Sequence, residues 1–295
     1  MKVAVAGLGS MGMGAALNLA ARGFTVTGAE PRQAARAELE AAGGATVESA
    51  ALLPPGLDAL ILFTVNAGQA TDVLDAALDR VTPAGIVLNC VTVAPGAARQ
   101  FGARVEAAGR LYLDCPVSGG AKGARAGTMT AMASGAPTAF ARAEPVLAAI
   151  AGRIWRLGDE PGIGSTVKMV NQLLAGVHIA VAAEAMALGI RAGADPQTLF
   201  DVITTSAGNS WMFENRVPHI LAGDDTPLSA IDIFVKDLGI VLDGAHALQF
   251  PLPLAAAAHQ LFLAAAAAGD GGCDDAFVIR VWQRLAGIAL PEKQP

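Results

Sequence analysis

The chain of 295 residues has few cysteines, few aromatic residues and no excess of positive charge. Its three cysteines, Cys90, Cys115 and Cys273, lack the paired spacing of a zinc motif and fit free thiols in a reducing cytoplasm. The formal net charge of −6 argues against a basic surface for nucleic acid or anionic lipid. The four histidines show neither metal-ligand spacing nor a pattern of acidic partners, so we expect no metal site.

A long uninterrupted apolar segment is also lacking, although the mean hydropathy is positive at +0.47. Alanine accounts for much of that value, and no run approaches the roughly 18 apolar residues of a membrane span. The two most apolar stretches are interrupted by His178 and Glu184 and by His259 and Gln260. Because Met1 leads directly into an apolar strand and a glycine-rich turn, we expect no signal peptide. We therefore expect a cytoplasmic protein outside the membrane.

What is present begins with a short apolar segment at residues 3–6, followed by Gly7-Leu8-Gly9-Ser10-Met11-Gly12 and a helical pattern that ends by Gly23. Strand, Gly-x-Gly-x-x-Gly and helix form the order of a dinucleotide-binding fingerprint. Gly7 permits a tight turn, Gly9 lets the backbone approach a pyrophosphate, and Gly12 lets the helix pack on the strand. The pyrophosphate would face the positive end of the helix.

The end of the next strand supports this interpretation and bears on the cofactor. Glu30 follows residues 24–29, at a position where an acidic side chain accepts hydrogen bonds from the adenosine ribose. The same carboxylate would repel the 2′-phosphate of NADP, which favours NAD. Arg32 leaves an alternative open, because a guanidinium can pair with that phosphate.

Three further strands are expected to end in polar loops. Because ligands of open α/β sheets bind beyond the carboxyl ends of the strands, these loops should line one crevice. Thr92 and Ser118 offer hydroxyl groups, and Gly119-Gly120 exposes backbone N–H groups that suit a carboxylate. A flexible Ser-Gly-Gly loop without a ligand is the alternative. The strands are 58–64, 86–90 and 111–114; the loop after the first runs from Val65 through Asn66 to Gln69, with a helix from about Thr71.

Strands at 128–134 and 154–157, with a helix over 137–150 between them, complete the first half. Residues 1–163 are therefore predicted to form an α/β domain, a Rossmann-type doubly wound sheet that binds NAD. Residues 164–295 are predicted to form an all-α domain for substrate binding and oligomerisation. We expect helices at 196–205, 211–221, 229–248, 254–267 and 274–285.

A long helix between the two domains is the segment on which the second one is built. It should run from Gly162 to Gly193 without proline, with Ser165 or Thr166 as its cap and Gly193 as its end. Lys168, Asn171 and Gln172 follow the spacing i, i+3 and i+4, so their side chains share one face of the helix. Such a polar group on a mostly apolar helix suggests a function; a solvated first turn with Lys168 in water is the alternative.

Taken together, these motifs make the chain similar to the β-hydroxyacid dehydrogenase family, which includes 3-hydroxyisobutyrate and tartronate semialdehyde dehydrogenases. The resemblance covers nearly the full length. The motifs in order are Gly7-Leu8-Gly9-Ser10-Met11-Gly12, Thr92 with Pro95, Asp114-Cys115-Pro116-Val117-Ser118-Gly119-Gly120, Gly164-Ser165-Thr166-Val167-Lys168-Met169-Val170-Asn171-Gln172, and Lys236-Asp237-Leu238.

Within the family the chain most resembles the L-threonate dehydrogenase group. Val65-Asn66 stands where many relatives carry Leu-Pro, and Cys90 stands where serine is common. The segments that carry this closer resemblance are Val65-Asn66-Ala67-Gly68-Gln69, Trp211-Met212-Phe213-Glu214-Asn215-Arg216 and Ala230-Ile231-Asp232-Ile233-Phe234-Val235-Lys236-Asp237.

The resemblance implies roles for particular residues. Lys168 would transfer the proton, and Asn171 would steady Lys168 or the substrate. Ser118, Gly119 and Gly120 would hold the carboxylate, with Gln172 also in the substrate site. The cofactor would contact Gly7, Leu8, Gly9, Ser10, Met11, Gly12, Glu30, Arg32, Val65, Asn66, Thr92 and Lys236. On the pattern alone, Lys236 is equally a surface lysine over an apolar helix face.

The implied activity is the NAD-dependent oxidation of a small polyhydroxy acid, L-threonate to its 2-oxo acid, by a homodimer or homotetramer that binds neither nucleic acid nor membrane. One alternative is an NADPH-dependent reductase of small aldehyde acids such as glyoxylate, or succinic or tartronate semialdehyde. Others are a 3-hydroxyisobutyrate dehydrogenase and a cofactor-binding scaffold without activity. The presence of Lys168 argues against the scaffold, and against the reduction of imines on the same architecture.

Overall fold

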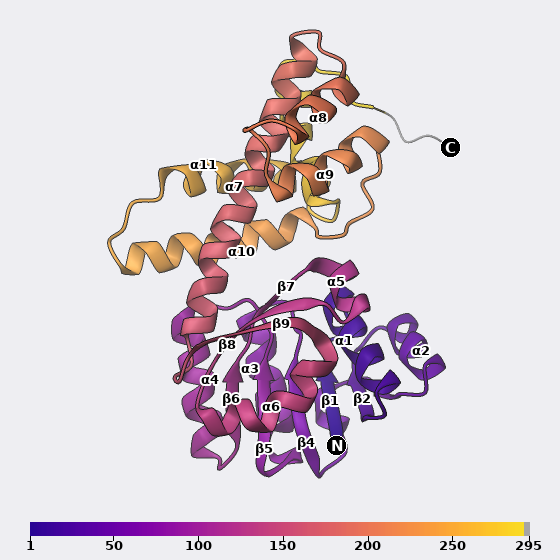
Figure 1. Ribbon diagram of the computed structural model, residues 1–295, viewed down its shortest axis with the longest axis vertical. Coiled ribbons are helices and arrows are strands. Elements are labelled where there is room, and N and C mark those ends of the chain that lie inside the picture. Colours follow the sequence, from indigo (N-terminus) through magenta and orange to yellow (C-terminus); the bar gives the residue numbers. More distant parts are fainter. Residues whose placement is uncertain (292–295) are drawn as a thin grey trace. The chain divides into compact units, whose positions relative to one another are not determined.

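The computed structural model describes residues 1–291 and comprises two compact units, the first Met1–Met169 and the second beginning at Val170. The first is an α/β unit around one sheet, and the second consists of helices (Figure 1). The predicted fold class, a Rossmann-type sheet followed by a helical domain that starts with a long helix, is confirmed.

The sheet of the first unit has the strand order β3-β2-β1-β4-β5-β6-β8-β7, with β9 also paired to β8. The pairings from β3 to β6 are parallel, β8 is antiparallel to β6 and β7, and β9 is parallel to β8. The strands are β1 (Lys2–Ala6), β2 (Thr25–Ala29), β3 (Ala45–Val47), β4 (Leu57–Leu62), β5 (Val81–Asn89), β6 (Leu111–Asp114), β7 (Val117–Ser118), β8 (Met129–Ser134) and β9 (Ala151–Gly158).

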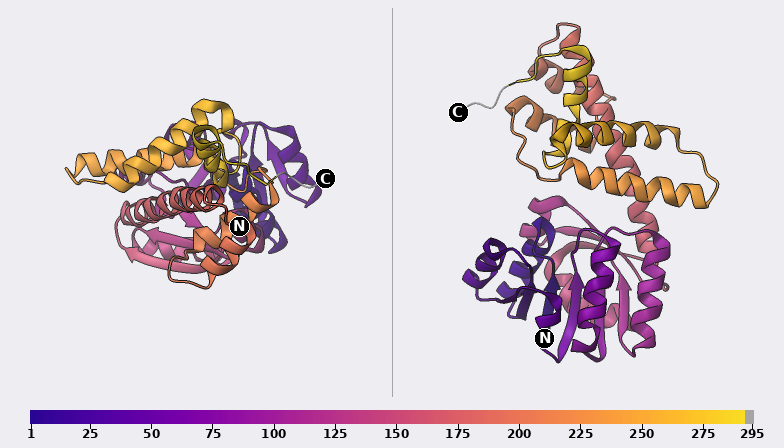
Figure 2. Two further views of the ribbon diagram at one scale, coloured as in Figure 1. Left: turned by 90° about the horizontal axis from the view of Figure 1, so that it is seen from above. Right: turned by 180° about the vertical axis from the view of Figure 1, so that it is seen from behind.

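Helices cover both faces of this sheet (Figure 2). The side chains of β1 point alternately to the two faces of the sheet. Val3 and Val5 lie in one apolar core, and Ala4 and Ala6 lie in the other. The helices are α1 (Ser10–Ala21), α2 (Gln33–Ala41), α3 (Ala67–Ala77), α4 (Pro95–Ala107), α5 (Gly120–Ala126) and α6 (Pro137–Ile150), with 3₁₀ turns at Ala50–Leu52 and Leu78–Arg80.

The loop after β4 is shorter than predicted. The expected helix start near Thr71 is wrong, because α3 begins at Ala67. The Asn66 side chain accepts a hydrogen bond from the Gln69 backbone N–H at 2.9 Å and so acts as the N-cap. In return, the Gln69 side chain accepts the N–H of Val65 at 2.9 Å. This reciprocal capping resembles a capping box and lets the helix start four residues earlier than expected.

The long helix α7 (Ile163–Arg191) begins before both residues that were expected to cap it. Ser165 and Thr166 lie in its first turn, where the Thr166 hydroxyl donates to the Gly162 carbonyl at 2.8 Å. α7 is long and apolar enough to cross a membrane by length and composition, but nearly half of its most apolar stretch is buried within the protein. We interpret it as a core helix.

Within the described residues, five further α-helices follow α7, the first four near their predicted positions and the last beginning later than the predicted residue 274: α8 (Pro196–Thr204), α9 (Trp211–Ala222), α10 (Ile231–Ala247), α11 (Pro253–Ala265) and α12 (Arg280–Ala286). α11 continues into a π-helical turn, Ala266–Asp270, and a 3₁₀ helix, Asp275–Ile279, precedes α12. α10 and α11 run side by side (Figures 1 and 2). Gly176 on α7 permits a close approach of α10, since a Cβ there would lie 2.9 Å from Leu238.

One histidine has an acidic partner that the sequence pattern did not indicate. His219 has an acidic partner, since its Nδ1 lies 3.5 Å from the buried carboxylate of Asp274. The partners are 55 residues apart, and only the fold brings them together. Beside them the Arg216 guanidinium pairs with Asp275 at 2.5 Å, also within the core of the helical unit. Among the described residues, no group of acidic, histidine and cysteine side chains could hold a metal ion.

Candidate active site

The glycine-rich turn lies between β1 and α1, at the point where the sheet order reverses from β2-β1 to β1-β4. Gly7 has a φ of +92°, and a Cβ there would lie 2.7 Å from the Phe63 carbonyl oxygen. A Cβ at Gly12 would lie 1.9 Å from the Gly7 oxygen, whereas one at Gly9 would meet no atom within 4 Å. The turn is therefore closed on the protein side and open at Gly9, which fits the pyrophosphate of a dinucleotide.

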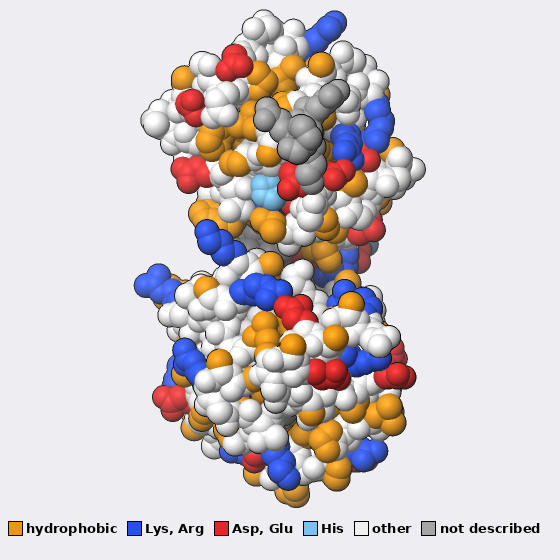
Figure 3. All heavy atoms as spheres, turned by 90° about the vertical axis from the view of Figure 1, so that its right-hand side faces the viewer, with side chains coloured by type: hydrophobic (Ala, Val, Ile, Leu, Met, Phe, Trp, Pro, Cys, Tyr) orange, Lys and Arg blue, Asp and Glu red, His pale blue; other side chains and the backbone are white. Residues whose placement is uncertain are grey.

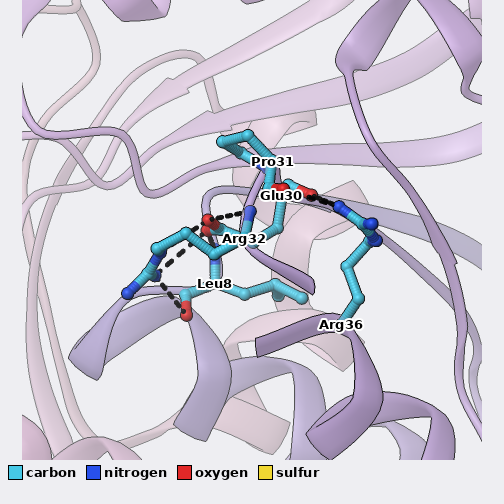
Figure 4. Close-up of polar contacts among 5 residues, drawn as sticks. All are labelled: Leu8, Glu30, Pro31, Arg32 and Arg36. Carbon is cyan, nitrogen blue, oxygen red and sulfur yellow. Dashed lines mark hydrogen bonds and ion pairs between the residues drawn. The ribbon is translucent and has the colours of Figure 1, made fainter. Parts of the chain in front are cut away.

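Glu30 and Arg32 form a tight network beside this turn (Figure 4). The buried Glu30 carboxylate accepts the Leu8 N–H at 2.9 Å, the Arg32 N–H at 3.1 Å and Arg32 Nε at 2.7 Å. Burial by itself would raise the pKa of Glu30, but the Arg32 and Leu8 hydrogen bonds and the Arg32 charge outweigh it and lower that pKa. Glu30 therefore stays ionised, and most of the Arg32 charge is already compensated.

A cavity of about 270 Å³ lies next to the glycine-rich turn and Arg32. It is bounded by the backbone of the turn, by α2 and by α5. Arg125 of α5 and Glu38 of α2 both line it and pair with each other at 2.7 Å. Its wall includes Leu8, Gly9, Ser10, Arg32, Glu38 and Arg125. The structure thus brings the predicted cofactor residues Leu8, Gly9, Ser10 and Arg32 together around one cavity.

The loops after β4, β5 and β6 follow neighbouring parallel strands and therefore share one edge of the sheet with the turn. Val65 is exposed, and Asn66 caps α3. Thr92 lies between β5 and α4 and is half-buried. These three residues lie at the predicted edge, and Asn66 has a structural task there as well.

The segment from Ser118 to Gly120 connects the short strand β7 to α5. Gly119 has a φ of +127° and Gly120 a φ of +62°, conformations that side-chain-bearing residues rarely adopt. β7 pairs with β8, as Val117 with Ala131 and Ser118 with Thr130. The Ser-Gly-Gly segment is therefore an ordered turn held by a strand on one side and a helix on the other, which argues against the flexible-loop alternative.

Asp114, at the end of β6, organises the start of α7. Its buried carboxylate accepts the Gly162 N–H at 2.9 Å, the Ser165 N–H at 2.8 Å and the Ser165 hydroxyl at 2.7 Å. A Cβ at Gly164 would lie only 2.3 Å from the Met132 oxygen, so the helix start packs directly on the sheet. Burial raises the pKa of Asp114, although the hydrogen bonds from Ser165 and Gly162 oppose the change.

Lys168 follows Ser165 by three residues, so the helix start that Asp114 anchors also sets the direction of the lysine. Its side chain is buried, with 6% of its surface exposed. A lysine is rarely so buried without a specific environment. The alternative of a solvated first turn with Lys168 in water is therefore wrong.

In the second unit, Asp237 joins three of the residues singled out in the sequence. Gln172 donates to one oxygen of the Asp237 carboxylate, and the Lys236 ammonium pairs with the other. Asn171 in turn donates to the Gln172 side-chain oxygen at 2.9 Å. Asp237 is buried, with 2% of its surface exposed. Lys236 is therefore not a free surface lysine but part of a hydrogen-bonded chain that connects α10 with α7.

Sequence reasoning assigned no task to Asp114 or Asp237, although both lie in motifs that it recognised. A carboxylate directly at the end of a buried strand, and another in the apolar part of a predicted helix, were the available signals. Such residues are seldom fully buried unless they are paired. Apart from Lys236, which is adjacent to Asp237, and Ser134, which is 20 residues from Asp114, their partners lie 48 to 65 residues away, so these pairings could not be read from local sequence.

Comparison with known proteins places the whole chain in one family. Residues 2–158 match the family described as the NAD-binding domain of 6-phosphogluconate dehydrogenase. Residues 162–282 match the NAD-binding family of NADP-dependent 3-hydroxyisobutyrate dehydrogenase.

Full-length relatives agree with these matches. The L-threonate dehydrogenase of Cupriavidus necator is 54% identical over 99% of this chain and 98% of its own length. That of Escherichia coli K12 is 49% identical over 98% of this chain and 96% of its own. The crystal structure of a 3-hydroxyisobutyrate dehydrogenase from Salmonella typhimurium superposes with a TM-score of 0.91 at 48% identity, over 95% of this chain and 99% of that one. The chain belongs to the 3-hydroxyisobutyrate dehydrogenase family of NAD(P)-dependent hydroxyacid dehydrogenases.

Proposed function

We propose that the enzyme oxidises L-threonate to its 2-oxo acid with NAD, at the hydroxyl group next to the carboxylate. The observation that carries this proposal is the full-length identity of 47–54% to five proteins named L-threonate dehydrogenase. The buried Lys168 supports an active enzyme rather than a cofactor-binding scaffold.

Lys168 is the proposed proton-transfer residue, and Asn171 is the proposed residue that steadies the lysine or the substrate. Oxidation of an alcohol requires the hydroxyl proton to leave as the carbon loses hydride, and a neutral amine within hydrogen-bond reach accepts that proton. Lys168 is buried near the start of α7, which keeps its amine away from bulk water and supports this role. Bound NAD supplies the hydride acceptor, while the protein orients the acid and removes the proton.

The carboxylate of the acid is proposed to bind at Ser118, Gly119 and Gly120. The Ser118 hydroxyl is one proposed donor, and the backbone N–H groups of the two glycines, whose positive φ values disfavour other residues, are the others. Gln172 is proposed to belong to the substrate site, and Thr92 and Lys236 to lie near the nicotinamide. The hydrogen bond that Gln172 donates to Asp237 fixes the orientation of the Gln172 amide.

NAD rather than NADP is the proposed cofactor. Glu30 is ionised beside the glycine-rich turn, and the guanidinium of Arg32 is already engaged by it. A 2′-phosphate would have to approach that carboxylate and compete with it for Arg32. Gly7, Gly9 and Gly12 support the pyrophosphate, and Leu8, Ser10, Met11, Val65 and Asn66 complete the proposed contacts.

We also propose a homo-oligomer, a dimer or a tetramer, that works in the cytoplasm. Several large apolar side chains of the helical unit are exposed, among them Leu188, Trp211, Leu248, Phe250 and Leu254. One face of that unit, with apolar side chains between charged ones, is visible in the upper part of Figure 3. The described cysteines are free thiols, which suits a reducing compartment. Light scattering on the purified enzyme would give its mass directly.

A second candidate, 3-hydroxyisobutyrate dehydrogenase, is favoured by the similarity to the Salmonella typhimurium enzyme of that name. The two candidates differ in where the hydroxyl lies. In L-threonate it is on the carbon next to the carboxylate, and in 3-hydroxyisobutyrate it is one carbon further away.

Formation of reduced cofactor, followed by absorbance, decides between the candidates. Wild-type enzyme would be assayed with NAD and NADP against L-threonate, D-threonate, D-erythronate and 3-hydroxyisobutyrate. Reduction of glyoxylate and succinic semialdehyde with NADPH would be measured in parallel. We expect the highest kcat/KM with L-threonate and NAD. A higher value for 3-hydroxyisobutyrate, or for aldehyde reduction with NADPH, would overturn the proposal.

A further inference from the structure

The short helix α5 follows directly on the Ser118–Gly119 turn and lies against α1, the helix of the dinucleotide fingerprint. Both helices belong to the first unit. α5 has only seven residues, too few to be stable in isolation. The position of the turn that precedes it therefore depends on what holds α5 in place.

Asn18, on α1, makes that connection. Its side-chain amide donates to the carbonyl oxygens of Ala124 at 2.9 Å and Arg125 at 3.1 Å, and to that of Gly14 on its own helix at 2.8 Å. Ala124 and Arg125 lie in the last turn of α5, where carbonyls lack the regular helical partner; the Ala124 carbonyl also accepts the Gly127 N–H at 3.3 Å. Asn18 thus satisfies the end of a helix that is more than 100 residues further along the chain.

Gly14 shows independently that the two backbones are in contact. A Cβ at this position would lie 2.5 Å from the Ala124 carbonyl carbon and 2.6 Å from the Arg125 nitrogen. These are backbone atoms, which cannot rotate away as the end of a side chain can. Gly14 lies outside the Gly7, Gly9 and Gly12 fingerprint, so a requirement of the pyrophosphate does not explain it. The close approach of α5 does.

One further contact ties α5 to the neighbouring helix α2. Arg125 pairs with Glu38 at 2.7 Å, but both side chains are about half exposed. Exposed ion pairs contribute little. The hydrogen bonds of Asn18 are therefore the stronger polar attachment of α5.

We propose that Asn18 is a positioning residue that holds the Ser118–Gly120 turn in the geometry required for binding the acid. This inference rests on the proposed function, in which that turn receives the substrate carboxylate. Asn18 itself touches neither ligand. Its loss should weaken binding of the acid more than binding of NAD, because the open N-terminal end of α1 is unchanged and α5 contributes only Arg125 to the wall of the cofactor cavity.

Asn18→Asp tests the inference, because the side chain keeps its shape but loses both amide hydrogens and turns an oxygen toward three carbonyls. We expect the KM for the acid to rise about tenfold, in line with the loss of several partly buried hydrogen bonds. The Kd of NAD, measured without acid, should rise by a clearly smaller factor than the KM. Amide hydrogen exchange should become faster at residues 118–128.

Asn18→Ser is the second variant, in case the aspartate does not fold. A serine in a helix can donate to the carbonyl four residues earlier, here Gly14, so α1 is preserved while the link to α5 is lost. The same separation of KM from Kd is expected. Asp58→Asn is the control. Asp58 contacts Lys2 and Arg142 near the start of β4, at the end of the strands that is opposite to the glycine-rich turn. The substitution should lower the melting temperature without changing KM.

The inference is overturned if a folded Asn18 variant keeps the wild-type KM, or if KM and the Kd of NAD rise by the same factor. The measurement uses whichever acid the wild-type enzyme oxidises best. If that acid is not L-threonate, the proposed substrate is wrong while the test of Asn18 still gives an answer.

Discussion

The Ser165 hydroxyl and backbone N–H both donate to the Asp114 carboxylate, at 2.7 and 2.8 Å, across 51 residues of sequence. A helix normally takes its cap from the residue just before it. Here the cap comes from the end of a buried strand, so the sheet fixes where α7 starts and which way Lys168 points. The lysine's orientation is thus set by a carboxylate on a different element, at the end of β6.

Asp114→Asn should therefore lower both stability and turnover. The asparagine keeps one acceptor but directs an NH₂ group toward backbone and hydroxyl donors, leaving at least one of them unsatisfied. We expect a loss of about 2 kcal/mol or more in the free energy of unfolding, with a clear fall in kcat. Urea unfolding and steady-state kinetics measure the two effects. In Asp58→Asn, at the opposite end of the strands, stability should fall without loss of kcat; equal kcat in both variants would contradict the orienting role of Asp114.

Lys168→Ala should abolish turnover and spare cofactor binding. Removal of a proton-transfer residue costs about 10²–10⁴-fold in kcat. The Kd of NAD, followed by fluorescence, should stay within about twofold of the wild-type value because the glycine-rich turn is unchanged. Lys168→Arg keeps the positive charge but cannot act as a base at neutral pH, so it should be as inactive as the alanine variant. Activity within a factor of ten of wild type in either variant would exclude the proposed mechanism.

The elements with clear boundaries were predictable from sequence because their signals are local. Pro137 starts α6 where predicted, and α9 begins at Trp211 after a serine cap. β3 and β7 went unpredicted because three and two residues are too few to show an alternating pattern. Asn66 did carry a local signal, a capping residue three positions before a glutamine, which had been interpreted only as a cofactor contact.

The candidate site divides in the same way. Its glycines, Glu30 and Lys168 were predictable because each belongs to a motif with a fixed spacing. Asp114, Asp237 and Asn18 act through partners far away in sequence, and only the packing of helices and strands determines those partners. The Arg32–Glu30 pair could have been foreseen from its spacing of two residues, and it changes how the arginine is interpreted.

Glu30→Gln should shift cofactor use toward NADP. In the wild type, the Glu30 carboxylate engages Arg32 and would repel a 2′-phosphate. The neutral amide of the variant would release the guanidinium and remove the repulsion. We expect the ratio of kcat/KM for NADP to that for NAD to rise about tenfold. The double variant with Arg32→Ala should lose this gain, because the freed guanidinium is its source. If Glu30→Gln leaves the ratio unchanged, Glu30 does not select the cofactor.

Asp237→Asn should impair turnover through its two partners. The carboxylate holds Gln172 on one oxygen and Lys236 on the other, and it is almost completely buried. An amide in its place loses the charge pairing with Lys236, for which we expect about a tenfold or greater fall in kcat/KM. Asp243→Asn is the matched control, since Asp243 lies on the same helix but is exposed. Equal effects of the two substitutions would show that Asp237 has no specific role.

The helical unit should become less stable as pH rises from about 4 to 6, because of Asp275. Its carboxyl is fully buried, pairs with Arg216 at 2.5 Å and lies next to Asp274. Burial, with a smaller contribution from the Asp274 charge, outweighs the effect of Arg216 and raises the pKa of Asp275 to about 6. The folded protein then binds more protons than the unfolded chain between the two pKa values, so stability falls with rising pH across that window, by at most about 3 kcal/mol.

Urea unfolding of wild type and Asp275→Asn at pH 4.5 and pH 7 isolates this contribution. Ionisable groups away from Asp275 are present in both proteins and cancel in the comparison. The wild type should lose more stability than the variant between the two pH values, because only the wild type must release the proton of Asp275; at pH 7 the variant also lacks the charged partner of Arg216. Asp243→Asn should reproduce the wild-type dependence. Parallel pH dependence in wild type and Asp275→Asn would mean that Asp275 ionises at the same pH in the folded and the unfolded chain.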